Sequence, residues 1–367
     1  MNPFQRIAIP AFLAFISIAG AGWAAELSWI KISDHKTGFV SVDSGKKFIP
    51  WGVNYDHDDA GRLLEDYWEA EWPTVVSHFA AIKELKANVV RIHLQFGKFM
   101  DGPKAPNSQA LRRLARLVQL AEQTKLYLDL TGLGCYHKRD VPVWYDDLSE
   151  QERWNAQAEF WRAVAECCQA SPAIFCYDLM NEPVVPGGRR NERDWLGPPF
   201  AGKHFVQVIT LDQRDRPRPE IARAWLRQLT EAIRTVDTRH LITVGLVDWS
   251  LDRPGLTSGF VPGMVAESVD FLSVHIYPES GKAAEALQTL AGFKVGKPIV
   301  IEETFPLKCS TNELAQFIQE SKTSACGWVS FYWGKPLDQL RKSRELGDAI
   351  LLEWLDKFQE LAPAMTN

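Results

Sequence analysis

Short apolar runs of strand length alternate along the chain with longer segments in which apolar residues recur at helical spacing. The apolar runs begin near residues 48, 88, 126, 173, 241, 270, 298 and 327. Helical spacing is clearest in the segment that follows Pro73, where one face carries Val76, Phe79, Ile82 and Leu85. Strands that alternate with helices in this way predict a parallel sheet covered by helices, which is an α/β fold.

Eight strands, nearly all separated by a helical segment, are the number that closes a (β/α)8 TIM barrel. The remaining helices are expected at 108–121, 149–168, 220–236, 282–293, 312–322 and 346–361. An open doubly wound sheet is the competing architecture, but no glycine-rich fingerprint follows the first strand. Because no linker divides the sequence, we expect residues 25–367 to form a single domain.

The first residues follow a different pattern. Arg6 precedes an apolar run from Ile7 to Ile18, and small residues follow that run. This order is typical of a signal peptide, and the run is shorter than the roughly 20 apolar residues of a membrane span. We therefore expect residues 1–24 to be a signal peptide, the protein to be secreted or periplasmic, and no membrane span to remain after cleavage. An uncleaved membrane anchor is the alternative.

Composition narrows the function classes. The chain is 46% hydrophobic and 24% charged with a net charge of −5, which describes a mildly acidic globular protein and argues against a nucleic-acid partner. Its 14 tryptophans offer large flat apolar faces suited to sugar rings, although most must fill the core. The six cysteines lack the spacing of a disulfide scaffold or a zinc site, and we expect neither a metal nor an organic cofactor.

Polar residues gather where the expected strands end. The fourth strand runs into Asn181-Glu182-Pro183, and the seventh ends in Glu302-Glu303. Other strand ends supply Asn54, Arg91 with His93, Asp129, His275 with Tyr277, and Trp333. Active sites of such barrels lie at the C-terminal strand ends, so these residues are the candidate site. Pro183 disfavours the helical conformation for Glu182, which we expect to be extended.

Two carboxylates at these strand ends suit the hydrolysis of a glycosidic bond. One protonates the leaving oxygen, and the other attacks the anomeric carbon or activates water. The acid must stay protonated because it is poorly solvated or has acidic neighbours. The nucleophile must stay ionised, which a partner such as Arg91 or a tyrosine hydroxyl would ensure.

The ordered set of Arg91, Asn181-Glu182-Pro183, His275-x-Tyr277, Glu302-Glu303 and Trp333 resembles the retaining glycoside hydrolases of family five, the cellulase and mannanase type. The resemblance covers about residues 48–335. It implies hydrolysis of a β-linked polysaccharide or oligosaccharide, glucan- or mannan-like, with retention of configuration.

The resemblance also implies individual roles. Glu182 would be the acid/base and Glu303 the nucleophile. Asn181 would bind the 2-hydroxyl of the sugar, Tyr277 would hydrogen-bond the nucleophile, and Arg91 would hold it ionised. The remaining substrate-binding candidates are His275, His93 and, as the floor of the site, Trp333.

Two departures from the family pattern keep alternatives open. Thr304-Phe305 follows Glu303 where the family has an aromatic-glycine pair, so Glu302 is an alternative nucleophile. Strand three reads Asp129-Leu130-Thr131 where the family often reads Asp-x-His. A non-catalytic carbohydrate-binding or cell-surface barrel is therefore the rival reading. Strict alternation would also place Asn181 and Glu182 on opposite faces, so the strand must break near Pro183 if both reach the site.

Overall fold

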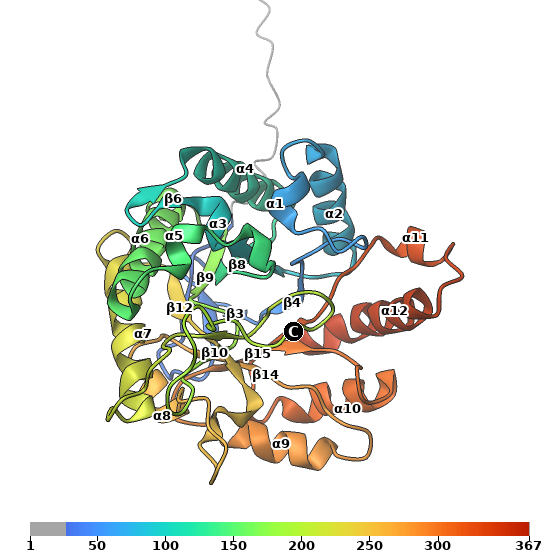
Figure 1. Cartoon of the computed structure of the whole chain (residues 1–367). Coiled ribbons are helices and arrows are strands. Elements are labelled where there is room, and N and C mark those ends of the chain that lie inside the picture. The colour runs from blue at the N-terminus through green and yellow to red at the C-terminus, as the bar shows by residue number, and fades with distance from the viewer. Residues whose placement is uncertain (1–26, 367) are drawn as a thin grey trace, which may run out of the picture.

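The computed structural model describes residues 27–366 and shows parallel strands ringed by helices, as Figure 1 illustrates. The strands of the central sheet are β4 (Trp51–Asn54), β5 (Val89–Gln95), β8 (Tyr127–Gly134), β9 (Ile174–Asp178), β12 (Leu241–Thr243), β13 (Gly245–Val247), β14 (Leu272–His275), β15 (Ile299–Thr304) and β16 (Gly327–Ser330). The predicted (β/α)8 barrel is confirmed.

The sheet closes on itself through its fifth strand. β12 and β13 are two segments of that strand, interrupted at Val244. β12 pairs in parallel with β9, and β13 pairs in parallel with β14. The nine strands of the sheet therefore count as eight barrel strands, with the order β12-β9-β8-β5-β4-β16-β15-β14-β13.

The long helices pack against the outside of the sheet. They are α2 (Trp72–Glu84), α4 (Ser108–Thr124), α6 (Glu150–Cys168), α7 (Arg218–Arg234), α9 (Ala283–Ala291), α10 (Thr311–Ser321) and α12 (Leu346–Thr366). The start of α6 shows why these segments become helices. Ser149 Oγ accepts a hydrogen bond from the N–H of Glu152, whose carboxylate accepts the N–H of Ser149 in return.

Shorter elements connect this framework. The short helices are α1 (Leu64–Tyr67), α3 (Phe96–Phe99), α5 (Val143–Asp146), α8 (Pro262–Val265) and α11 (Leu337–Leu340), with 3-10 turns at Lys138–Asp140 and Asp248–Leu251. Two small ribbons pair β6 (Met100–Gly102) with β7 (Ala105–Pro106), and β10 (Pro183–Val184) with β11 (Gln207–Val208).

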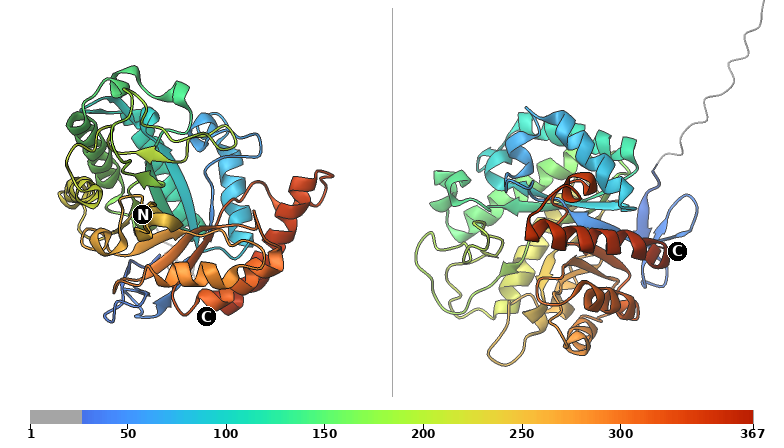
Figure 2. Two further views of the ribbon diagram at one scale, coloured as in Figure 1. Left: turned by 60° about the horizontal axis from the view of Figure 1, so that its bottom comes forward. Right: turned by 90° about the vertical axis from the view of Figure 1, so that its right-hand side faces the viewer.

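An antiparallel sheet closes the N-terminal end of the barrel. It consists of β1 (Ile30–Ile32), β2 (Phe39–Ser41) and β3 (Lys47–Phe48). The fully buried ring of Phe39 lies 5.1 Å from those of Phe175 and Phe271, which belong to the strand starts. Figure 2 (right) shows this blue sheet at one end of the barrel and the long loops at the other. The opposite end is therefore the one left for a site.

Residues 1–24, the expected signal peptide, lie outside the described residues. None of the helices within residues 27–366 combines the length and the apolar composition of a membrane-spanning segment. All six cysteines are free thiols.

Candidate functional site

Glu182 and Glu303 meet at the C-terminal end of the barrel. One oxygen of each carboxylate and one ring nitrogen of His275 all lie within 4.8 Å of one another. The two glutamates border a cavity of about 180 Å³. Its other lining residues are Asn181, Pro198, Phe200, Phe205, Val206, Tyr277, Leu307 and Phe331. The structure thus brings together the two carboxylates that the sequence singled out.

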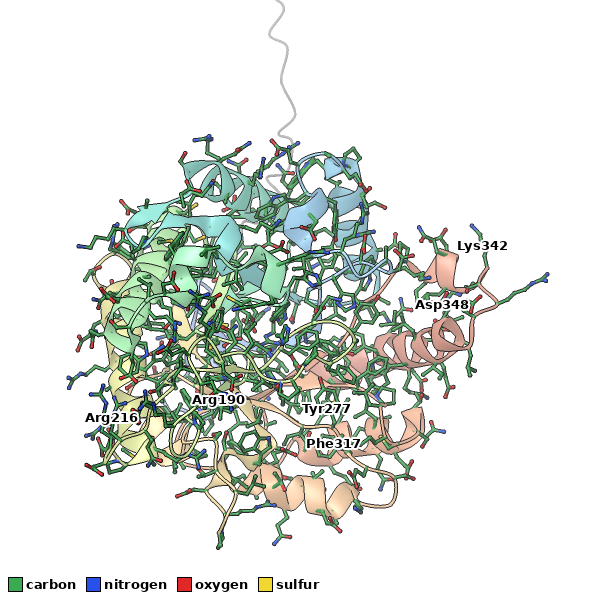
Figure 3. The ribbon with its side chains drawn as sticks, in the orientation of Figure 1. Arg190, Arg216, Tyr277, Phe317, Lys342 and Asp348 are labelled. Atoms are coloured by element: carbon green, nitrogen blue, oxygen red, sulfur yellow. The ribbon has the colours of Figure 1, made fainter. Side chains whose placement is uncertain are left out.

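Glu303 is held on both of its oxygens. Arg91 Nη1 donates to Oε1 at 2.6 Å, and Tyr277 Oη, labelled near the middle of Figure 3, donates to Oε2 at 2.7 Å. Burial raises the pKa of Glu303, while His275 and Arg91 act against that rise. The carboxylate is therefore oriented by two donors and faces the cavity.

Glu182 is held differently. His275 Nδ1 donates to its Oε1 at 2.9 Å, and the Glu182 N–H donates to the carbonyl oxygen of Gly245 at 3.1 Å. Its backbone φ is +46°, in the left-handed region. The expectation that Pro183 holds Glu182 extended is therefore wrong. Proline excludes only the right-handed helical conformation, and the hydrogen bonds to the fifth and sixth strands select the left-handed one.

The predicted break in the fourth strand is present. β9 ends at Asp178, and the next four residues leave strand geometry before β10 begins. Asp178 Oδ1 accepts the N–H of Gly245 at 2.8 Å, which anchors the break to the fifth strand. Because alternation stops there, Asn181 and Glu182 both reach the cavity.

Arg91 is the fully buried cation that joins the strand ends. Beyond Glu303, its guanidinium donates to Asn54 Oδ1 at 2.9 Å, Asp178 Oδ2 at 2.7 Å and Asn181 Oδ1 at 3.0 Å. A planar group with several donors suits this set of acceptors, which one ammonium could not satisfy together. Arg91, a predicted substrate-binding residue, does not line the cavity, and it positions other groups from below.

Glu302 points into the barrel interior and is fully buried. Ser273 Oγ donates to its Oε1 at 2.9 Å, and its Oε2 lies 3.5 Å from both Arg91 Nη2 and His275 Nε2. Burial opposes ionisation, but Arg91 and His275 lower the pKa of Glu302 to about 2. Burial and the charge of Glu302 raise the pKa of the neighbouring Asp129 well above its ordinary value. Glu302 is therefore the ionised partner of this pair and Asp129 the protonated one.

His275 lies between the two glutamates of the cavity. Burial alone would lower the pKa of this imidazole, but Glu303, Glu182 and Glu302 raise it to about 10. His275 is therefore an imidazolium at neutral pH. Its positive charge stabilises a site crowded with carboxylates.

This pKa predicts how stability varies with pH. The folded value of about 10 exceeds the ordinary 6.5, so the contribution of His275 is complete below pH 6.5 and is lost as the pH rises toward 10. We expect the free energy of unfolding of the parent protein to fall by up to about 1.4 kcal/mol per pH unit across this window. His275→Asn should lack this additional fall. Urea unfolding of both proteins at several pH values measures the difference. Parallel curves would contradict the assignment of the charge to His275.

Besides Arg91, His93 and Trp333 are predicted substrate-binding residues that do not line the cavity. His93 is buried, with Nδ1 bonded to Tyr136 Oη and Nε2 at 3.0 Å from Asn54 Oδ1. Trp333 is also buried, and its ring lies 4.5 Å from that of His78. The chain leaves strand geometry after Ser330, which turns the indole toward α2, so Trp333 does not form the floor of the cavity. The lining aromatic of this segment is Phe331.

Several positioning groups were missed from the sequence. Asp178 ends an apolar strand and was not singled out from the sequence. A single charged residue in such an apolar run could have indicated a buried polar role. Gly245 carried no signal, yet an added Cβ would lie 3.0 Å from His275 Nε2 and 3.3 Å from Arg91 Nη2, which leaves little room for a side chain. Phe205 lies on a long loop, where local pattern says nothing about the cavity.

Two side-chain groups within the described residues have spacings that could hold a metal ion, namely Asp129, Cys176 and Glu302, and Glu182, His275 and Glu303. Both belong to the hydrogen-bonded and charged network described above. In the second group the imidazolium of His275 already supplies a positive charge, so a metal ion would have to displace its proton.

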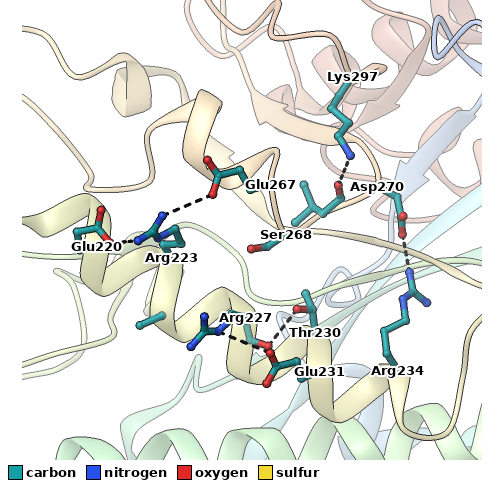
Figure 4. A pocket seen from close by; sticks show the side chains of 12 residues that line it. Glu220, Arg223, Arg227, Thr230, Glu231, Arg234, Glu267, Ser268, Asp270 and Lys297 are labelled. Atoms are coloured by element: carbon teal, nitrogen blue, oxygen red, sulfur yellow. Dashed lines mark hydrogen bonds and ion pairs between the residues drawn. The ribbon is translucent and has the colours of Figure 1, made fainter.

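A larger hollow of about 570 Å³ lies elsewhere, along the outer surface of α7 (Figure 4). Its arginines pair with acidic side chains, and Lys297 Nζ donates to the carbonyl oxygen of Val269. Arg223 contacts Glu220 and Glu267, and Arg234 Nη2 lies 2.7 Å from Asp270 Oδ2. These paired charges leave the groove without the converging polar groups of a ligand site.

The amino-acid sequence also matches a known protein family and several curated relatives. A family model described as cellulase, glycosyl hydrolase family 5, matches residues 52–334. Mannan endo-1,4-beta-mannosidase A of Podospora anserina is 26% identical over 189 residues, which cover 46% of this chain and 42% of that relative. The chain spans about half the length of the curated relatives it matches.

Solved structures share the fold. The exo-beta-1,4-mannosidase from Opitutaceae bacterium strain TAV5 superposes with a TM-score of 0.68 at 17% identity, covering 92% of this chain and 62% of that one. The endo-1,4-beta-mannanase from Rhizomucor miehei superposes with a TM-score of 0.62 at 17% identity, covering 91% of this chain and 100% of that one.

Proposed function

Because this chain belongs to the cellulase family, glycosyl hydrolase family 5, we propose that it hydrolyses O-glycosidic bonds of a β-linked glycan with retention of configuration. The observation that carries the proposal is that one carboxylate oxygen of Glu182 and one of Glu303 lie within 4.8 Å of each other. Retaining enzymes hold their two carboxyl groups about 5–5.5 Å apart, and inverting enzymes roughly 6.5–9.5 Å apart to admit a water.

In the first step, a Glu303 oxygen attacks the anomeric carbon while Glu182 gives its proton to the leaving oxygen. Arg91 and Tyr277 hold Glu303 in place for that attack. In the second step, Glu182 takes a proton from water, and the resulting hydroxide displaces Glu303 from the anomeric carbon. Both glutamates then return to their starting protonation states.

Access to the cavity favours Glu303 over Glu302 as the nucleophile. The carboxylate of Glu303 borders the cavity, whereas that of Glu302 is fully buried against Ser273 and Arg91. An attacking oxygen must reach the sugar, and only Glu303 of the two has that access. Glu302 instead fits a role in holding Arg91 and His275.

The departures from the family pattern are compatible with catalysis. Phe305 packs toward Trp354, with ring centroids 6.5 Å apart. Thr131 Oγ1 donates to Asp178 Oδ2 at 2.7 Å and so joins the network around Arg91. Thr131 therefore supports the site from below, and Phe305 packs against the helical layer. This weakens the rival proposal of a carbohydrate-binding barrel without activity.

The substrate class in this proposal is a glucan- or mannan-like polysaccharide or oligosaccharide. The mannan named for the relatives above supports the second, although those names describe the relatives. We further propose that the enzyme acts outside the cytoplasm, on the basis of the N-terminal sequence pattern.

Incubation with aryl β-glucosides and β-mannosides, followed by proton NMR from the first turnover, tests the proposal. We expect the β-anomer of the free sugar to appear first and the α-anomer to follow by mutarotation. Initial release of the α-anomer would mean inversion. Binding of glycans without product from any substrate would favour the non-catalytic rival.

A further inference from the structure

The long segment after the fourth strand, residues 185–217, crosses the open end of the barrel. Its hairpin tip pairs Phe200 with Lys203, and the Lys203 Nζ lies next to Gly61, where an added Cβ would be 3.5 Å away. Gly61 belongs to the loop after β4, the first barrel strand. Figure 1 shows this yellow-green loop passing in front of β4. We call residues 197–207 the crossing segment.

Bonds to the strand ends fix the crossing segment in place. Asn181 Nδ2 donates to the carbonyl oxygen of Phe205 at 3.0 Å, which ties it to the residue beside Glu182. The N–H of His204 donates to Tyr136 O at 2.9 Å, and Gln207 Nε2 donates to Leu133 O at 2.8 Å. A segment held by buried and half-buried hydrogen bonds to the ends of the third and fourth strands acts as a fixed wall.

Phe205 is the inner face of this wall. Its ring centroid lies 4.8 Å from that of Tyr136, which follows the third strand, and 6.2 Å from that of Phe331, which follows the eighth. Phe205 therefore lies across the C-terminal end of the barrel, between the residues that follow the third strand and those that follow the eighth. Together with Pro198 and Val206, it closes that side of the cavity.

The cavity is small for a glycan-binding site. At about 180 Å³ it lies below the roughly 300–1,000 Å³ of ordinary ligand sites and holds roughly six waters at about 30 Å³ each. That space admits one sugar ring. The rim formed by Leu307, which follows the seventh strand and lies outside the crossing segment, is open, since Leu307 is 52% exposed.

From this wall and this volume we propose that the enzyme is exo-acting and removes single sugar residues from the non-reducing end of its substrate. The inference rests on the proposed function. The reacting sugar must present its anomeric carbon to Glu303 and its leaving oxygen to Glu182. The far side of its ring then meets the crossing segment, where no further sugar fits. The leaving part of the chain extends over the open rim.

β-1,4-Linked mannopentaose and cellopentaose, reduced at one end, test this mode of action. We expect the monosaccharide and the reduced tetrasaccharide as the first products, and no early fall in the viscosity of a polysaccharide solution. Early di- and trisaccharides with a rapid fall in viscosity would overturn the exo mode and leave the proposed function standing. No hydrolysis of any oligosaccharide or aryl glycoside would overturn both.

Opening the wall gives a second test. We compare the full chain with Phe205→Ala and with a variant in which Gly-Gly replaces residues 198–203. The readout is the ratio of disaccharide to monosaccharide released, which should rise by about tenfold or more in both variants even where the overall rate falls. A folded variant that cleaves aryl glycosides and still releases only monosaccharide would show that the crossing segment does not set the mode of action.

Discussion

Glu303→Gln is expected to lower kcat on aryl β-glycosides by a factor on the order of 10⁴ or more. An amide cannot act as the anionic nucleophile, while its oxygen can still accept the bond from Arg91 and its NH2 group can donate to the Tyr277 hydroxyl, which keeps the site assembled. Steady-state kinetics measures the loss, and circular dichroism with thermal melting checks that the variant is folded. Activity close to that of the parent chain would remove Glu303 from the mechanism.

Glu302→Gln is the matched control, because it makes the same chemical change at the adjacent residue. It removes a charge near Arg91 and His275 but no group that borders the cavity, so it should retain far more activity than Glu303→Gln. A 2-deoxy-2-fluoro glycoside traps the glycosyl-enzyme, and mass spectrometry of the labelled peptide locates the sugar. A label on Glu302 would reverse the assignment of the nucleophile.

Arg91→Met is expected to lower the free energy of unfolding by about 3–5 kcal/mol. The substitution keeps much of the side-chain volume but leaves Asp178, Glu302 and Glu303 buried without their shared cation. Some of these carboxylates must then take up protons, so the loss should be larger at pH 8 than at pH 5. Urea unfolding at both pH values measures it.

Arg344→Met provides the comparison for this prediction. Arg344 is exposed in the segment before α12, and the same change there should alter the free energy of unfolding by no more than about 0.5 kcal/mol. Equal effects of the two substitutions would mean that the buried network does not depend on Arg91. Arg91→Lys should fall between them, since an ammonium keeps the charge but cannot satisfy all the acceptors.

The barrel was predictable because its signals are local. Strand-length apolar runs recur eight times and segments with helical spacing seven times, and caps such as Ser149 with Glu152 mark where helices begin. The interruption of the fifth strand at Val244 carried no such signal. It arises from pairing with β9 on one side and β14 on the other, which only the closed barrel determines.

The sequence predicted which residues form the site better than it predicted how they are oriented. The ends of β9, β14 and β15 delivered Glu182, His275 and Glu303 as expected. The ring direction of Trp333 and the wall formed by Phe205 were not predictable, since both depend on contacts between segments far apart in sequence. The backbone of Glu182 was misjudged because the neighbouring proline leaves two conformations open, and tertiary hydrogen bonds choose between them.

The left-handed backbone at position 182 means that folding stability and the proposed proton transfer favour different residues there. Only glycine adopts this conformation freely, and any other residue there costs roughly 1–2 kcal/mol of folding stability. Selection for stability alone would favour glycine at position 182, whereas the proposed proton transfer requires a carboxylate there. If the proposed proton transfer is correct, the glutamate at position 182 contributes to activity at a cost in folding stability.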